Sequence, residues 1–363
     1  MQTILSIVPR LPPAIDGVGD YAHLLSKALA DRHGILTKFI ACDPLKPIAS
    51  EQGDLSAIQL PQRSRDSLLT ILTRSGHIDT ILLHYVGYGY ARRGCPLWLV
   101  AALSKWKAAK SSRRLVIMFH EVYATSDRPW SSQFWTSPIQ RQIAQDLADL
   151  GDIVITSNQL FANLIQELTN KHDGKIDILP IFSNVGENRS PLPLTERQPW
   201  LVTFGNSSLR QSIYTDSLDR LTRVCQQLDL RKIYDIGHNS STIVRPVPGV
   251  KIHAMGTLST AEISQIFSCA QVGFINYSIP YLAKSGIFAA YCAHQMLSVF
   301  DDRNLGVNID GLEYNKHYLA IPGSDGIIDV NLAQTIANNA YQWYSQHSLR
   351  RVASRIADLL NQV

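Results

Sequence analysis

The sequence predicts an α/β protein built from two doubly wound halves, each with a parallel sheet covered by helices on both faces. Short apolar runs, such as 79–86 and 114–121, alternate with longer amphipathic stretches along the chain. These runs are continuously apolar, which is typical of strands buried on both faces of a parallel sheet. The alternation stops at residues 186–199, which contain three prolines and no apolar period. This segment is therefore predicted to be a linker between two domains.

The predicted elements follow one another as strand and helix in both halves, and 363 residues are enough for two cores. The expected domains are residues 1–185, the linker 186–199, residues 200–345, and a final helix, 346–363, that packs back on the first half. Strands are expected at 3–8, 36–43, 79–86, 114–121, 152–158, 175–182, 200–205, 232–237, 250–256, 272–277 and 296–301. Helices are expected from about residue 20, near 65–74, 138–149, 159–171, 213–228 and 259–269, from about residue 285, and over 331–361.

The composition is that of a soluble globular protein, with 45% hydrophobic and 18% charged residues. Five scattered cysteines indicate neither a disulfide framework nor a zinc knuckle, so no metal is expected. No apolar run reaches the roughly 18 to 20 residues that a spanning helix needs, and the first residues lack the pattern of a signal peptide. We therefore expect a cytoplasmic protein.

One segment, residues 92–114, is strongly basic, with seven basic residues and no acid. It also contains Trp98 and Trp106, so it suits an amphipathic helix lying on the inner, anionic face of a membrane. A packed helix with a solvated basic face is the alternative. The net charge of +4 is too small to indicate nucleic acid, and no nucleic-acid partner is expected.

Candidate site residues follow the strands, because ligands of open parallel sheets bind outside the carboxyl ends of the strands. Gly17 and Gly19 lie where the first helix begins and would let backbone N–H groups approach an anion. This turn does not match GxGxxG, so a dinucleotide site is disfavoured. His120 ends a strand in "VIMFHE", where it can bind sugar hydroxyls or transfer a proton, although a core histidine is the alternative.

Residues for an acceptor pocket are expected in the same half. Tyr85 and Tyr88 belong to "LLHYVGYGY", and Glu121 follows His120. A packed loop is the alternative for this segment.

The second half contains the most specific local pattern of the sequence. Lys284, Ser285 and Gly286 stand at the start of a predicted helix, where a cation, a hydroxyl and backbone N–H groups favour the same diphosphate. Capping of the helix by Ser285 alone is the alternative. Gly205 and Arg210, in "FGNSSLR", follow another strand and complete the predicted donor site.

Several stretches of the sequence together resemble the GT-B glycosyltransferases, and among them the retaining glycosyltransferase family 4. They are "GVGDYAHLLSKAL", "VIMFHE", "DIVITSNQL", "FGNSSLR", "GTLSTAEISQIFSCAQVGFINY" and "KSGIFAAYCAHQ", and the resemblance extends over nearly the whole chain. The resemblance implies a GT-B fold and a sugar transferred from a nucleotide sugar to a saccharide or lipid-linked acceptor. The second half would hold the donor, the first half the acceptor, and the reaction would occur in the cleft between them.

The resemblance also implies roles for single residues. Gly17 and Gly19 would lie near the donor diphosphate or the acceptor, His120 would contact the donor sugar, and Arg210 with Lys284 would hold the phosphates. No metal and no cofactor besides the nucleotide sugar is implied, and the chain has no Asp-x-Asp motif. In the retaining mechanism the leaving phosphate can itself take the proton of the acceptor, so the protein need not supply a nucleophile.

The sequence departs from the family pattern at the donor site. The family has two glutamates eight positions apart, but the chain has no carboxylate from Ile263 to Phe300. The second glutamate would fall near Ala290, and Gln295 stands where a glycine is usual. The lysine expected shortly after Arg210 is also missing. These departures leave two alternatives to a transferase: a binding or scaffold protein that has lost the donor site, and a sugar-nucleotide epimerase, which would need carboxylates for proton abstraction.

Overall fold

The computed structural model describes residues 2–46, 56–124, 132–169, 171, 176–238, 244–301, 308–320 and 328–362. Its contacts divide the chain into two compact units. Unit 1 comprises Met1–Pro180 and Leu349–Val363, and unit 2 comprises Ile181–Ser348. Each unit contains a sheet whose described strands all pair in parallel. The predicted fold class is confirmed.

The seven strands of unit 1 have the order β3-β2-β1-β4-β5-β6-β7. They are β1 (Gln2–Val8), β2 (Ile35–Ala41), β3 (Ala57–Gln59), β4 (Thr80–Tyr85), β5 (Arg114–Phe119), β6 (Ile153–Thr156) and β7 (Asp177–Ile178). The helices of the unit are α1 (Gly17–His33), α2 (Arg65–Arg74), α3 (Gly87–Tyr90), α4 (Leu97–Ala108), α5 (Ser132–Leu150), α6 (Gln159–Leu168) and α12 (Leu349–Asn361).

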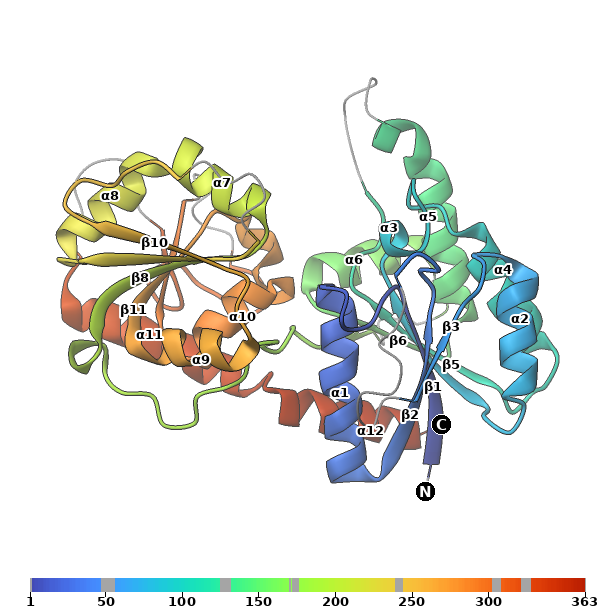
Figure 1. Ribbon diagram of the computed structural model, residues 1–363. Helices are drawn as coiled ribbons and strands as arrows, with labels where there is room; N and C mark the ends of the chain where they lie inside the picture. The colour runs from blue at the N-terminus through green and yellow to red at the C-terminus, as the bar shows by residue number, and fades with distance from the viewer. Residues whose placement is uncertain are drawn as a thin grey trace. The chain divides into compact units, whose positions relative to one another are not determined.

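Two groups of helices cover the first sheet. The strand order reverses between β1 and β4, and right-handed crossovers on the two sides of a reversal place their helices on opposite faces. Accordingly α1 packs against α12, whereas α2 packs against α4 and α4 against α5 (Figure 1). The side chains of β4 and β5 between these layers are almost all buried.

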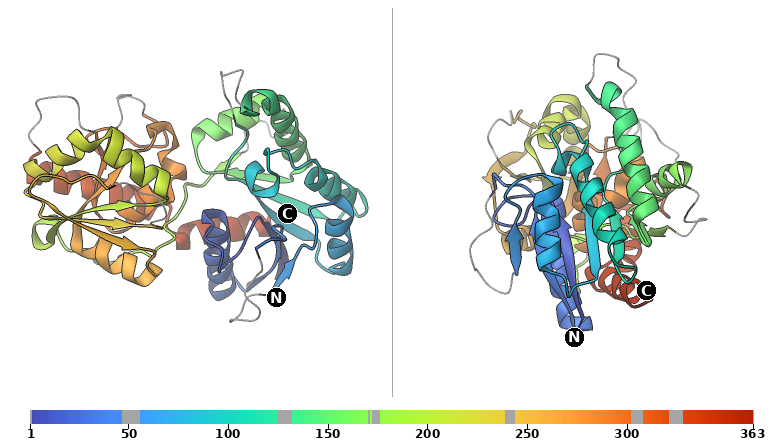
Figure 2. Two further views of the ribbon diagram at one scale, coloured as in Figure 1. Left: turned by 45° about the horizontal axis from the view of Figure 1, so that its top comes forward. Right: turned by 90° about the vertical axis from the view of Figure 1, so that its right-hand side faces the viewer.

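The six strands of unit 2 have the order β10-β9-β8-β11-β12-β13. They are β8 (Gln198–Phe204), β9 (Lys232–Ile236), β10 (Lys251–Gly256), β11 (Ala270–Ile275), β12 (Leu297–Phe300) and β13 (Leu319–Ala320). The helical elements are η1 (Leu194–Glu196), α7 (Ser207–Asp216), α8 (Leu218–Gln227), α9 (Thr260–Cys269), η2 (Ile279–Lys284), α10 (Gly286–Ala293) and α11 (Val330–Ser345). Figure 2 shows the second sheet between the layer of α7 and α8 and the layer of α9.

Residues 186–199, for which the sequence predicts a linker, pack on unit 2. Leu194 is buried in the core of this unit. The buried Arg197 donates through Nη1 to the carbonyl oxygens of Ala270, at 3.2 Å, and His294, at 2.9 Å. The chain passes between the units at Pro180 and Ile181 and again at Ser348 and Leu349.

The predicted amphipathic helix of residues 92–114 differs from the expectation. Trp106 is buried and Trp98 is half-buried, because α4 packs against α2 and α5. Lys107 and Lys110 form ion pairs with Asp152 and Asp79, both at 2.5 Å. The two tryptophans of this segment therefore do not present an apolar face, and part of its basic charge is neutralised.

Some short elements also differ from the prediction. The expected strand 175–182 is only β7, because Pro180 has no N–H for the sheet and the chain then passes to unit 2. The expected final helix 331–361 is two helices, α11 and α12, separated by residues 346–348. The sequence analysis missed β3, β13 and α3, each of which has four residues or fewer.

Candidate functional site

The carboxyl ends of the first sheet bring together two histidines. His84 is the second-to-last residue of β4, and His120 directly follows β5, where its backbone N–H donates to the carbonyl of Tyr85 at 2.9 Å. His84 Nδ1 lies 3.1 Å from His120 Nε2, and the rings are nearly parallel. Tyr21 of α1 meets both rings edge-on. His84 was not singled out from the sequence, because an apolar strand gives no sign of which residue its neighbouring strand presents.

Burial determines the charge of His84. It lowers the pKa of His84 to about 3, so this imidazole is neutral at physiological pH. Its Nε2 is buried and has no hydrogen-bond partner among the described residues. We assign the single proton of His84 to Nδ1, where it is donated across the 3.1 Å contact to His120. A proton on Nε2 would instead be a buried N–H without a hydrogen-bond acceptor in the described part of the chain. His120 Nε2 then accepts, and a neutral His120 carries its proton on Nδ1.

The tyrosines expected at an acceptor pocket have different surroundings. Tyr85 has no exposed surface and packs between Phe119 and Tyr90, so it cannot line a pocket in this structure. Its buried position also raises the pKa of its phenol. Tyr88, on α3, is 39% exposed, and Glu121 is half-buried. The acceptor prediction for Tyr85 is therefore wrong, while those for Tyr88 and Glu121 stay predictions.

An anionic side chain, that of Asp16, caps the glycine-containing start of α1. Asp16 is the N-cap of α1, and its Oδ1 accepts from the N–H groups of Val18 and Gly19, both at 3.0 Å. A Cβ at Gly19 would lie 2.3 Å from the carbonyl oxygen of Arg10, whereas a Cβ at Gly17 would meet nothing within 4 Å. Gly19 is thus required by a close approach of two backbone segments, and its N–H is engaged by Asp16 rather than exposed for a phosphate.

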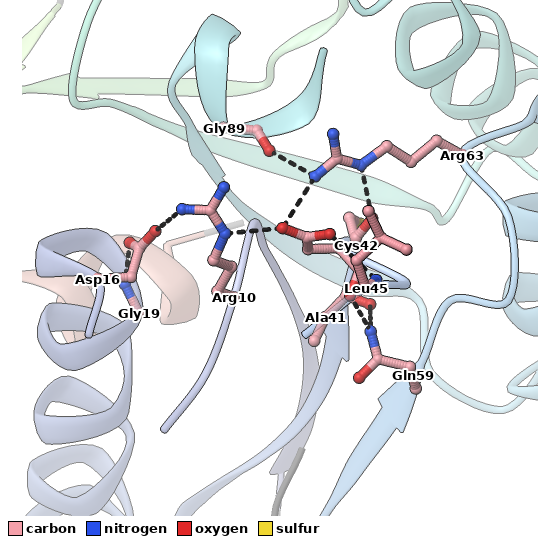
Figure 3. A network of polar contacts seen from close by, with 10 residues as sticks. Arg10, Asp16, Gly19, Ala41, Cys42, Leu45, Gln59, Arg63 and Gly89 are labelled. Carbon is pink, nitrogen blue, oxygen red and sulfur yellow. Dashed lines mark hydrogen bonds and ion pairs between the residues drawn. The ribbon is translucent and has the colours of Figure 1, made fainter. Parts of the chain in front are cut away.

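A network of charged side chains holds this turn against the ends of β1 and β2 (Figure 3). Arg10 Nε donates to Asp43 at 2.8 Å, and its Nη1 lies 3.4 Å from Asp16. Arg63 lies 3.4 Å from the same Asp43 oxygen and donates to the carbonyl of Gly89 at 3.1 Å. Burial alone would raise the pKa of Asp43, but the hydrogen bond from Arg10 and the positive charges hold it below its usual value. The charges of the two arginines and the two aspartates cancel, so the network has no net charge that would attract a ligand.

In the second sheet the strand order reverses between β8 and β11, and two helices begin there. The α7 helix starts after Gly205 and is capped by Asn206, whose side chain accepts from Leu209 N at 2.9 Å. The α10 helix starts after Lys284 and is capped by Ser285, whose hydroxyl accepts from Phe288 N at 3.2 Å. A Cβ at Gly205 would lie 2.7 Å from the Ile287 side chain, so the two turns are neighbours.

The start of α10 has a lysine side chain and an open position beside the backbone of Gly286. Lys284 is half-buried, with its ammonium 5.4 Å from the centre of the Tyr281 ring. A Cβ at Gly286 would meet no heavy atom within 4 Å. The N–H groups of a first helical turn point out of the helix and carry partial positive charge. Lys284, Ser285 and Gly286 thus lie together at a place with room for an anion.

Arg210 corrects an expectation, because it is not placed to clamp a phosphate. Its side chain is 0% exposed and forms an ion pair with the equally buried Asp235 of β9. Its remaining N–H groups donate to the carbonyls of Gly205, at 3.1 Å, and His238, at 2.5 Å. Arg210 therefore fixes the turns that follow β8 and β9, and its buried guanidinium is engaged by protein groups.

The positions that depart from the family pattern lie at the end of α10. Ala290 is buried inside this helix. Gln295 has φ +53°, a left-handed conformation that favours glycine, and follows the helix at its C-terminal cap. The backbone at residue 295 therefore has a conformation that glycine adopts readily, although the residue is glutamine.

Comparison with solved structures identifies the fold. TarM is 9% identical over 99% of both chains, with a TM-score of 0.64. An alpha-glucosyltransferase in complex with UDP-glucose and DNA is 11% identical over 99% of both chains, with a TM-score of 0.59. MnaA of S. aureus with UDP is 10% identical, covering 100% of this chain and 98% of that one, with a TM-score of 0.56. No protein-family profile and no curated protein sequence matches the chain. The chain therefore has the GT-B fold.

The DNA in one of these structures corrects an expectation. The small net charge led us to exclude a nucleic-acid partner, but a protein of this fold is seen with DNA. The fold therefore gives no ground for that exclusion.

Two features are absent from the described ranges. None of the helices placed there is both long and apolar enough to cross a bilayer. Nor do those residues include a group of three or more His, Cys, Asp or Glu side chains that could hold a metal ion.

Proposed function

We propose that the protein is a glycosyltransferase that moves a sugar from a nucleotide sugar to a saccharide or lipid-linked acceptor. The observation that carries this proposal is the start of α10, where Lys284, Ser285 and Gly286 stand beside the turn at Gly205. This is the reversal point of the second sheet, where α/β folds bind nucleotides. The solved structures with UDP or UDP-glucose support the choice of donor class.

Unit 2 holds the donor diphosphate in this proposal. Lys284 supplies the charge, the first turns of α7 and α10 supply dipoles and N–H donors, and Gly286 leaves room for the phosphates. Arg210 acts as a positioning residue that holds Gly205, and the capping hydroxyl of Ser285 orients the helix start. These cations and dipoles offset the charge of the leaving diphosphate, and we propose that no metal ion is required.

Unit 1 holds the acceptor, with Tyr88 and Glu121 as the residues that contact it. His120 binds the hydroxyls of the donor sugar through Nδ1–H, and His84 fixes that tautomer by donating to Nε2. Gly17 provides an open backbone position at the start of α1. The donor phosphate takes the acceptor proton on the same face of the sugar, which gives retention of configuration.

The experiment that tests the function measures nucleoside diphosphate released from a panel of UDP-, ADP- and GDP-sugars with saccharide and lipid-linked acceptors. Release that requires an acceptor, persists in EDTA and keeps the anomeric configuration supports the full proposal. Silence with every donor contradicts transferase activity, and isomerisation of a donor without acceptor would identify an epimerase instead.

A binding or scaffold protein is the second candidate. The absence of carboxylates from Ile263 to Phe300 favours it, because sugar and ribose hydroxyls lose their usual acceptors. The expected result for such a protein is no thermal shift with any nucleotide sugar.

A further inference from the structure

Unit 1 exposes large apolar side chains in α3, at the start of α4 and in the first turns of α5, and exposed arginines lie in or beside these segments. Trp135 is 70% exposed, Leu97 59%, Ile139 46% and Tyr88 39%. We call Tyr88, Arg92, Arg93, Leu97, Trp135 and Ile139 the aromatic-basic surface. Side chains of this size exposed together on one surface mark an interaction site more often than isolated ones do.

Gln140 of α5 joins the parts of this surface. Its Nε2 lies 2.8 Å from the carbonyl oxygen of Arg93 and 3.3 Å from the hydroxyl of Tyr88, and its Oε1 accepts from Ala124 N at 2.8 Å. Trp135 and Ile139 are four residues apart, so they lie on the same face of α5, next to the face that carries Gln140. Gln140 therefore ties α5 to Tyr88 and Arg93, and Trp135 and Ile139 lie on the same helix within two turns of this amide.

Two arginines of the surface form no ion pair within the described residues. Arg92 and Arg93 are exposed and have no ion-pair partner within the described residues, in contrast to Lys107 and Lys110 of the same basic segment. From residue 88 to 114 the sequence has no carboxylate, and the first one after Trp135 on α5 is Asp146. Arg141, which directly follows Gln140, adds a further exposed cation.

We infer that the aromatic-basic surface docks unit 1 on an anionic lipid bilayer. Arginines gain energy from anionic headgroups, and tryptophan and isoleucine gain energy by entering the boundary between headgroups and acyl chains. A soluble polyanion would use the arginines but would leave Trp135, Ile139 and Leu97 in water. The apolar side chains therefore favour a bilayer. This inference does not depend on the proposed transfer activity.

The test is co-sedimentation of the full chain with vesicles of phosphatidylcholine alone and of phosphatidylcholine with phosphatidylglycerol, at low and high salt. We expect binding to the anionic vesicles only, weakened by salt. Arg92→Ala and Arg93→Ala should each lower the partition coefficient about fivefold. Ile139→Ser should lower it on the order of tenfold, and Trp135→Ser similarly, whereas Trp135→Phe should retain most of the binding.

Matched controls lie outside the surface. The controls are Leu45→Ser, at a side chain that is 85% exposed, and Arg74→Ala, at an exposed position of α2. Both variants should bind vesicles like the parent chain. Equal melting temperatures establish that the variants are folded. Failure of the parent chain to bind anionic vesicles overturns the inference. It is also overturned if Trp135→Ser and Ile139→Ser bind as well as the parent while heparin competes, since that outcome identifies a polyanion site.

Discussion

The role of a single residue in the candidate site could be predicted from the sequence only where its interaction partners are near it in the chain. Helix capping by Ser285, the alternative to a diphosphate site, could be read from the sequence because the residues that it caps follow it directly. Arg210 was misjudged because its partner, Asp235, is 25 residues away on another strand. His84 was missed for the same reason, since only the pairing of β4 with β5 brings it to His120. Local chemistry is visible in sequence, but burial and pairing across strands are not.

The left-handed backbone at Gln295 gives a prediction at this scale. Glycine adopts this conformation without the clash of a Cβ, so Gln295→Gly should be more stable than Gln295→Ala by about 1 kcal/mol. Urea unfolding measures the difference. At the exposed helical Gln342 the order should reverse, because alanine is favoured over glycine inside a helix. Equal stability of the two variants at 295 would contradict the assigned conformation.

Asp20, in the first turn of α1, gives a prediction about pH. Burial, with a contribution from the charge of Asp16, raises the pKa of Asp20 from 3.8 to about 6. The folded state therefore binds this proton more tightly than the unfolded state, so stability is lost as the pH rises from about 4 to about 6. Asp20→Asn should raise the melting temperature at pH 8 and leave it unchanged near pH 3.5.

The control for Asp20 is Asp31→Asn, which removes an exposed carboxylate from the same helix. It corrects for the loss of one negative charge from the molecule. A gain for Asp20→Asn that is the same at both pH values would contradict the raised pKa.

At the scale of elements, the longer strands and helices could be predicted from the sequence. The bounds of an element could not be predicted where the chain leaves a sheet. Helix α2 has the predicted bounds, 65–74, because its apolar spacing and its Ser64 cap are local signals. β7 was predicted too long, since apolar residues after it serve unit 2 instead of the sheet. The glycine turn before α1 was interpreted as an anion site, whereas Asp16 and the network of Figure 3 give it a structural role.

The two glycines of that turn should respond differently to alanine. Gly19→Ala places a Cβ against the carbonyl of Arg10, and we expect a loss of about 1 to 3 kcal/mol in the free energy of unfolding. Gly17→Ala meets open space and should be neutral or stabilising by up to about 1 kcal/mol. Denaturant unfolding of both variants makes the comparison. A larger loss for Gly17→Ala would contradict the structural role given to Gly19.

At the scale of the whole molecule, alternating apolar runs predicted two doubly wound units, and the solved structures identify the fold as GT-B. The segment 186–199 was predicted from its prolines and charges to be a linker, although Leu194 and Arg197 bury it on unit 2. Composition shows where regular structure stops, but it does not show which surface an irregular segment covers. The central claim that results is a donor site at the start of α10.

The most direct test of this claim is the thermal shift of the protein with UDP, ADP and GDP, compared between the parent chain and Lys284→Ala. A nucleoside diphosphate at 100 times its dissociation constant should stabilise the parent by about 2.7 kcal/mol. Loss of the charged contact should weaken binding about 10- to 150-fold, while Lys251→Ala, at an exposed lysine of β10, should bind like the parent. A nucleotide that binds equally well to Lys284→Ala, or no shift with any nucleotide, would contradict the account.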